Sequence, residues 1–125
     1  MQGQVEGINK DSKRTRQQAD FQNLRCLYTN TRSIMNRGKM DELLCRLRDR
    51  KVDIMGIAES WTHEEIMDAE LNFEGYKCFR RDRDKVDGHR RIGGGVLLYV
   101  KKDIISYMLG EENECEALWV GVKTM

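Results

Sequence analysis

Residues 52–61, VDIMGIAESW, decide the fold: an almost unbroken apolar run ends on a carboxylate, Glu59, followed closely by Trp61. A continuous run of this kind predicts a strand covered on both faces, as in a parallel sheet. The side chain that follows such a strand emerges at the edge of the sheet, so the position of Glu59 calls for an explanation.

The residues before this run predict a helix and a further strand. Residues 38–50, GKMDELLCRLRDR, repeat apolar side chains at i, i+3, i+4 and i+7, the spacing of an amphipathic helix. Residues 24–30, LRCLYTN, alternate between two faces with the period of a strand that ends near Asn30. Strand, helix and strand in this order predict a βαβ unit with a right-handed crossover.

The βαβ unit brings Asn30 and Glu59 together, because both of its strands end at the same edge of the sheet. Neighbouring strands lie about 4.8 Å apart. A carboxylate beside an amide suits Mg²⁺, which binds one or two carboxylates and completes its shell with water and phosphate oxygens. By position alone, a solvated strand end or a charge at a helix N-terminus is the commoner role for such a glutamate.

The second half of the chain predicts mostly antiparallel strands. Residues 62–71, THEEIMDAEL, fit a short helix capped by Thr62. Three strands are then expected within residues 75–83, 93–103 and 116–123, and their short connections favour antiparallel pairing. Gly93, Gly94 and Gly95 open the second of these strands and predict a bulge or a wide hairpin loop, because no Lys-Ser or Lys-Thr follows them as in a P-loop.

Arginines concentrate between residues 80 and 91, where they could bind a phosphate backbone without reading its sequence. Aspartates interleaved with them favour a merely solvated loop. The candidate nucleic-acid-binding residues are Arg32, Arg80, Arg81, Arg83, Arg90 and Arg91.

Two tryptophans and four cysteines complete the set of informative side chains. Trp119 lies in an expected strand and is predicted to pack, whereas Trp61 is a candidate for lining the cleft beside Glu59. Cys26, Cys45, Cys78 and Cys115 lack metal-binding spacing and are expected to be reduced thiols in or near the core.

Composition places these elements in a single modest domain. The chain has 125 residues and a formal net charge of +1, which fits neither a histone-like DNA coat nor an acidic buffer. Residues 1–22 predict a disordered polar tail before a domain at 23–125. No apolar run is long enough to span a membrane and the first residues are unlike a signal peptide, so we expect a nuclear or cytoplasmic protein that is neither secreted nor bound to membranes.

Taken in order, LYTNTRSI, VDIMGIAESW, GYKCFRRDR, GGGVLLYVK and EALWVGV resemble the endonuclease/exonuclease/phosphatase superfamily, and within it the apurinic-type endonuclease domain of non-LTR (LINE-type) retrotransposons. The resemblance spans residues 23–123. It implies an α/β sandwich enzyme that hydrolyses DNA phosphodiester bonds with Mg²⁺, or with Mn²⁺ in its place. Glu59 would be the metal-binding glutamate, and Asn30 the asparagine that helps to hold metal and phosphate.

The family's later motifs do not occur in this sequence: an Asp-x-Asn pair and a terminal Ser/Thr-Asp-His motif. Neither His63 nor His89 is a convincing substitute. We therefore expect the N-terminal half of an α/β sandwich, weak or inactive by itself, with exposed strand edges that favour self-association and with weak, largely sequence-independent DNA binding. The alternatives are a noncatalytic nucleic-acid-binding or inert fragment, and a phosphatase of the same superfamily.

Overall fold

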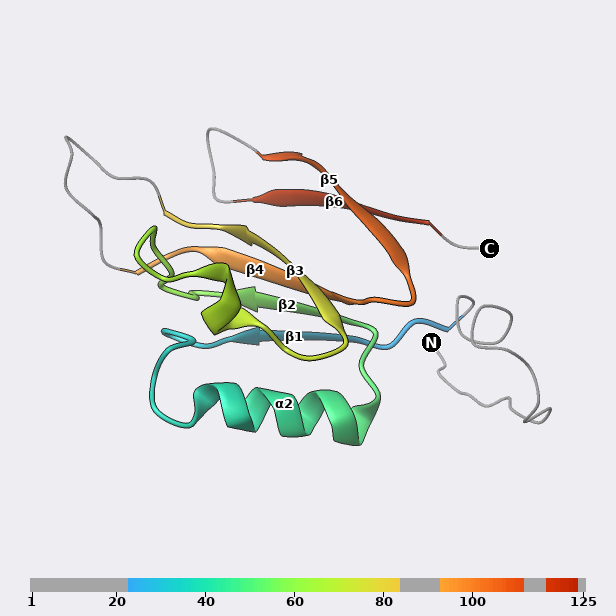
Figure 1. Ribbon diagram of the computed structural model, residues 1–125, viewed down its shortest axis with the longest axis horizontal. Coiled ribbons are helices and arrows are strands. Elements are labelled where there is room, and N and C mark those ends of the chain that lie inside the picture. The colour runs from blue at the N-terminus through green and yellow to red at the C-terminus, as the bar shows by residue number, and fades with distance from the viewer. Residues whose placement is uncertain (1–22, 84–92, 112–116, 124–125) are drawn as a thin grey trace.

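The structure, a computed structural model, describes residues 23–83, 93–111 and 117–123 (Figure 1). Its elements in chain order are β1 (Cys26–Asn30), α2 (Lys39–Arg50), β2 (Ile54–Ala58), the 3₁₀ helix η1 (Asp68–Leu71), β3 (Tyr76–Arg81), β4 (Val96–Lys101), β5 (Ile105–Glu111) and β6 (Leu118–Lys123). The predicted tail, residues 1–22, and the singled-out residues His89, Arg90, Arg91 and Cys115 lie outside the described residues.

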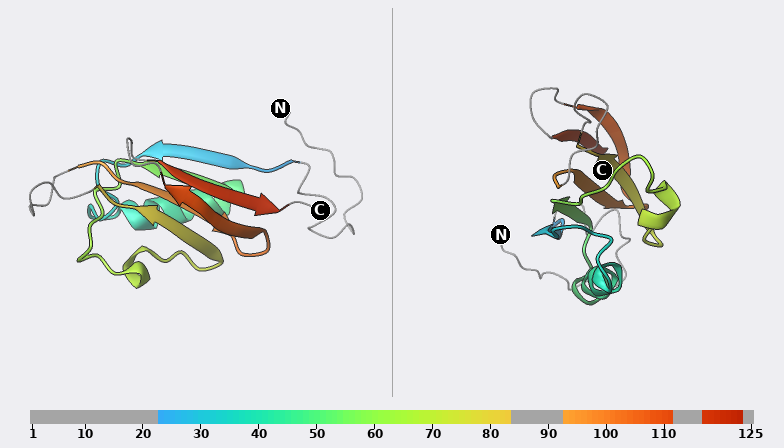
Figure 2. Two further views of the ribbon diagram at one scale, coloured as in Figure 1. Left: turned by 90° about the horizontal axis from the view of Figure 1, so that it is seen from above. Right: turned by 90° about the vertical axis from the view of Figure 1, so that its left-hand side faces the viewer.

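Within the described residues, six strands form two sheets, one of four strands in the order β1-β2-β4-β3 and one of β5 and β6. β1 and β2 are parallel neighbours, as the βαβ prediction requires, while β4 pairs antiparallel with both β2 and β3. The end-on view in Figure 2 shows α2 and η1 on one face of the larger sheet and the β5–β6 pair over the other. The fold is an incomplete two-sheet α/β sandwich, and the predicted fold class is confirmed.

Helix α2 covers the first face through a narrow apolar stripe. Its Leu43 and Leu47 are buried, and its charged residues point to solvent. Gly38 begins the helix with φ of 80°, a left-handed conformation that glycine adopts readily. Asp41 in the first turn and Arg48 in the last complement the helix dipole.

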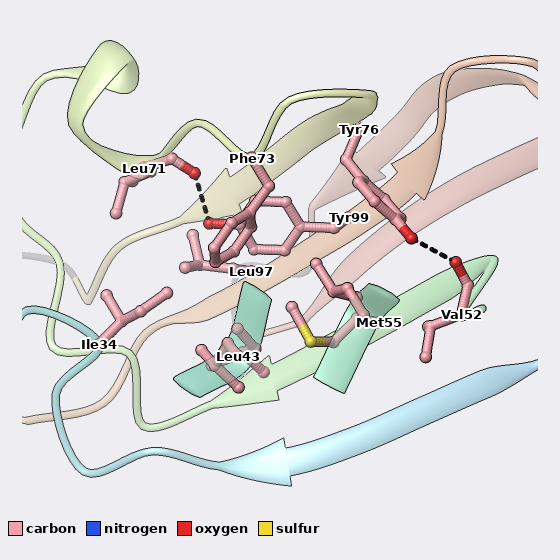
Figure 3. Packing of buried hydrophobic residues seen from close by; sticks show 11 residues of the cluster. Ile34, Leu43, Val52, Met55, Leu71, Phe73, Tyr76, Leu97 and Tyr99 are labelled. Atoms are coloured by element: carbon pink, nitrogen blue, oxygen red, sulfur yellow. Dashed lines mark hydrogen bonds between the residues drawn. The ribbon is translucent and has the colours of Figure 1, made fainter. Parts of the chain in front are cut away.

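The main core lies between α2, η1 and the larger sheet (Figure 3). Tyr99 is completely buried, and its hydroxyl donates to the carbonyl oxygen of Leu71 at 2.8 Å. Tyr76 similarly donates to the carbonyl of Val52. These bonds give each buried hydroxyl a hydrogen-bond partner, and without one its burial would destabilise the fold. The core side chains are Ile34, Leu43, Leu47, Val52, Met55, Ile57, Leu71, Phe73, Tyr76, Leu97 and Tyr99.

The opposite face of the larger sheet is only partly covered. A smaller cluster of Phe79, Val100 and Ile104 packs there against inward side chains of β6. Beside it lies an apolar hollow of about 440 Å³ between β1, β2, β4 and β6, bordered by Tyr28, whose side chain is 72% exposed. Strand β2 is therefore buried on its helix face and half-buried on the other, where Ile54 packs against the smaller cluster. The prediction of a strand covered on both faces is confirmed for the helix face and only partly for the other.

Several predictions about individual elements and side chains were also wrong. Residues 62–71 contain the 3₁₀ helix η1 in place of the expected helix capped by Thr62, and β5 was not anticipated. Trp119 is 57% exposed, so it is not part of the core, contrary to the prediction that it packs there. Cys26 and Cys45 are free thiols as expected but are exposed at the surface.

Among the described residues, no helix has the length and apolar character needed to cross a membrane.

Candidate functional site

The carboxyl edge of β1 and β2 is held together beyond the ends of both strands. Asn30 lies opposite Ala58 in the parallel register. Past that pair, the amide of Thr31 donates to the carbonyl of Ala58 at 3.0 Å, and the amide of Ser33 donates to the carbonyl of Glu59 at 2.8 Å. The hydroxyl of Thr31 donates to the same Glu59 carbonyl at 2.9 Å. The structure thus places Asn30 and Glu59 at one edge, as predicted.

Glu59 has a strained backbone and an oriented side chain. Its φ is 55° and that of Trp61 is 60°, both in the left-handed region that non-glycine residues avoid. The indole nitrogen of Trp61 donates to Oε1 of Glu59 at 2.9 Å, and the amide of Gly94 approaches the same oxygen at 3.4 Å. Trp61, the candidate for lining the cleft, thus contacts the candidate metal ligand directly.

Three consecutive glycines support this segment from the other side. Gly93, Gly94 and Gly95 have φ of 89°, 71° and 87°, each in the left-handed region. Their segment lies beyond the last paired residues of β2 and β4, and it is held to the loop after Glu59 because the amides of Ser60 and Trp61 donate to the carbonyls of Gly95 and Gly94 at 3.2 and 2.8 Å. The tripeptide is therefore part of the site's framework, a role that the prediction of a bulge did not include.

A buried polar network fixes the chain that follows Glu59. The hydroxyls of Ser60 and Thr62, whose residues are 0% and 3% exposed, lie 3.1 Å apart. Thr62 also donates to Oδ1 of Asp82 at 2.6 Å, and Asp82 accepts two bonds from Arg80 at 3.2 and 2.8 Å. This network ties the loop after β2 to the end of β3.

Arg80 uses all of its side-chain donors within the protein. Two of its N–H groups bind Asp82, one binds Asp68 at 2.8 Å, and two bind the carbonyls of Ile66 and His63. The bonds to Asp82 are the largest cause that raises the pKa of Arg80, ahead of the opposing effect of burial. These bonds hold the loop after β2 against the end of β3, and this structural role explains the position of Arg80 without a contact to nucleic acid.

The other arginines proposed for nucleic-acid binding lie in different environments. Arg81 is buried at 7% exposure, whereas Arg32 is exposed and has a φ of 48° beside the candidate edge. Arg83 is half-buried and its guanidinium lies against Gly94. Arg90 and Arg91 fall outside the described residues. Of the described set, Arg32 and Arg83 combine solvent access with proximity to the edge.

The donors at the edge fit a hard divalent cation in chemical type. Glu59 offers a carboxylate and Asn30 an amide oxygen, the oxygen ligands that Mg²⁺ accepts. Within residues 23–83, 93–111 and 117–123, no three side chains of His, Cys, Asp or Glu form a metal-binding group. A bound Mg²⁺ would therefore take most of its ligands from water and phosphate.

Sequence reasoning assigned Gly94 to a bulge or loop and Thr62 to a helix cap, and it missed their contacts with Glu59 and Asp82, which join segments distant along the chain. The tripeptide of glycines was a visible signal that a backbone had to approach another group closely. Nothing in the sequence pattern identified which group that would be.

No family model matches the chain, and no curated protein matches it in a sequence search.

Proposed function

We propose that this chain carries the metal-binding edge of a Mg²⁺-dependent phosphodiesterase that acts on DNA, the activity of the endonucleases that its motifs resemble. The observation that supports it best is the oriented carboxylate of Glu59. Its backbone is strained, its Oε1 is bound by Trp61 and approached by the Gly94 amide, and its neighbour across the strand pair is the segment ending in Asn30. Strain and fixed orientation at one acidic side chain are typical of functional sites.

Each residue has a distinct part in the proposed site. Glu59 would hold the cation, while Trp61 and the Gly94 amide keep the carboxylate from rotating. Asn30 would orient a metal-bound water or a phosphate oxygen. The cation supplies charge neutralisation of the phosphodiester and activation of a water molecule. Because a single carboxylate holds Mg²⁺ loosely, we expect weak metal binding and slow hydrolysis by these residues alone.

The noncatalytic alternative depends on the basic segment at residues 80–91. Internal bonds occupy Arg80 and burial encloses Arg81, which leaves Arg83 as the accessible arginine of the described part of that segment. One accessible arginine in the described part, residues 80–83, gives little electrostatic attraction to DNA by itself. The metal-dependent proposal uses the same edge and explains the oriented carboxylate as well.

Metal binding can be tested through the fluorescence of Trp61. A Trp119→Phe variant makes Trp61 the sole tryptophan, and Mn²⁺ bound at Glu59 would quench it because the indole contacts that carboxylate. Glu59→Gln keeps an acceptor for the indole and removes the charge, so we expect it to abolish saturable quenching. Asp49→Asn, which removes an exposed carboxylate from α2, is the matched control and should leave quenching unchanged.

Activity can be tested with the same variants on supercoiled plasmid. We expect slow nicking that requires Mg²⁺, stops with EDTA and is lost in Glu59→Gln but kept in Asp49→Asn. Saturable quenching that persists in Glu59→Gln, or nicking that is independent of Glu59, would refute the proposal.

A further inference from the structure

Arg83 lies on a surface that only glycine can provide. A Cβ atom added to Gly94 would lie 2.6 Å from Nη2 of Arg83 and closer still to its Nε and Cζ atoms. The guanidinium therefore rests directly against the backbone of Gly94. Because it fills the place of a missing side chain, its position depends on the glycine.

The same glycine segment joins Arg83 to the candidate metal ligand. The position of a Cβ on Gly93 would be 3.7 Å from Nη1 of Arg83, 3.8 Å from Oε1 of Glu59 and 3.5 Å from the indole nitrogen of Trp61. The guanidinium and the carboxylate thus border one small region of the surface. This arrangement brings a cation from the end of β3 to the edge formed by β1 and β2.

Electrostatics gives this arrangement a use. A phosphodiester that approaches the edge carries a negative charge towards the negative carboxylate of Glu59, which opposes binding. A guanidinium at the same surface offsets that repulsion. Its planar array of N–H groups also matches the oxygens of a phosphate, which a lysine ammonium does not.

We infer that Arg83 binds a backbone phosphate of nucleic acid at this edge, and that the Gly93–Gly94 segment holds its guanidinium in place. The inference rests on the proposed function, since it takes the phosphodiester to be the ligand of the same edge. Arg83 makes no contribution to sequence preference in this role, because phosphate contacts position a nucleic acid without reading its bases.

Binding of a fluorescein-labelled 20-base-pair duplex, followed by anisotropy in EDTA and in Mg²⁺, tests the inference. We expect Arg83→Gln to weaken binding about tenfold, the size expected for one charge-assisted contact. The slope of log K against log salt should fall in magnitude by about 0.9, corresponding to one phosphate. Arg48→Gln removes the same charge from the exposed side of α2 and should leave the slope unchanged.

Two glycine variants separate the position of Arg83 from backbone strain. Gly93→Ala and Gly94→Ala both place alanine at a positive φ, 89° and 71°, but only the second collides with the guanidinium. We expect Gly94→Ala to weaken DNA binding as much as Arg83→Gln, with no further loss in the double variant. Gly93→Ala carries the same backbone strain without the collision, so it should weaken DNA binding less than Gly94→Ala does.

The outcomes distinguish this inference from the proposed function. Parent-like DNA binding in both Arg83→Gln and Gly94→Ala would overturn the role of Arg83, as would absence of duplex binding by the parent chain. Quenching of Trp61 by Mn²⁺ tests the metal site separately and should persist in Arg83→Gln. Loss of DNA binding in the Arg83 variants without any Glu59-dependent metal response would support the phosphate contact and refute the metal-dependent chemistry.

Discussion

Arg80 forms ion pairs of the same length with two aspartates, and we predict that only one of them matters for stability. Its guanidinium lies 2.8 Å from Asp82 and 2.8 Å from Asp68. The side chain of Asp82 is 22% exposed, whereas that of Asp68 is 90% exposed. Asp82→Ala and Asp68→Ala therefore each remove an ion pair of the same length to Arg80, but one pair is partly buried and the other is exposed to solvent.

The expected magnitudes follow from these surroundings. Asp82→Ala removes two bonds to the partly buried Arg80 and one bond from Thr62, which is 3% exposed. Breaking a buried pair costs about 3–5 kcal/mol, and residual exposure and the remaining Arg80 bonds reduce this to about 2–3 kcal/mol. Asp68→Ala removes a solvated pair and should cost about 0.5 kcal/mol or less.

Urea unfolding followed by tryptophan fluorescence measures both variants against the parent chain. The two free energies of unfolding should differ by about 2 kcal/mol, with unchanged m-values. Equal losses would show that the length of the ion pair, rather than its burial, governs its contribution to stability. A loss under about 1 kcal/mol for Asp82→Ala would show that Asp82 does not hold the network after Glu59.

Two further predictions concern a thiol and a surface. Burial is the main cause that raises the pKa of Cys78 to about 11, so its reactive thiolate is scarce at pH 8. Iodoacetamide should therefore alkylate the exposed Cys45 at least about tenfold faster than the half-buried Cys78, as measured by peptide mass mapping. Equal rates would contradict the partial burial of Cys78. Leu109 is 62% exposed on β5, where an apolar face favours self-association, and Leu109→Lys should weaken association by about tenfold in sedimentation velocity. Met67→Lys, at a similarly exposed residue outside that strand pair, is the control, and an equal effect would rule out a specific role for the β5 face.

The βαβ unit was predictable because its signals are local. The helical spacing of Leu43 and Leu47 and the apolar run after residue 52 each report one element, and the parallel crossover then fixes where Asn30 and Glu59 emerge. The observed ends of β1, α2 and β2 differ from the predicted ones by at most two residues. The positions of the two candidate site residues therefore followed from sequence alone.

The helix predicted after Thr62 failed for a tertiary reason. Its capping hydroxyl instead binds Asp82, and Arg80 binds the carbonyls of His63 and Ile66 that a helix would have used internally. These partners lie 14 to 20 residues further along the chain, beyond the reach of a local pattern. Long-range contacts override a modest helix propensity here.

Strand β5 escaped prediction because its alternation is interrupted. Its register with β6 shifts between Met108 and Gly110, which leaves Leu109 unpaired and breaks the period of two. Its partner strand is also the one in which Trp119 faces solvent, against the usual preference of a large aromatic side chain. Because both strands expose apolar side chains, the sequence pattern did not distinguish the buried face of this strand pair from the exposed face.

The left-handed backbone at Glu59 sets stability against the proposed metal chemistry. A β-carbon at that conformation costs about 1–2 kcal/mol, and glycine is the residue that would remove the cost. In a library selected for folded abundance alone, the backbone term at this position favours replacing the carboxylate with glycine. Under the proposed function, a library selected for metal-dependent cleavage would discard the same replacement, so the amino acid tolerated at position 59 would depend on which property is selected.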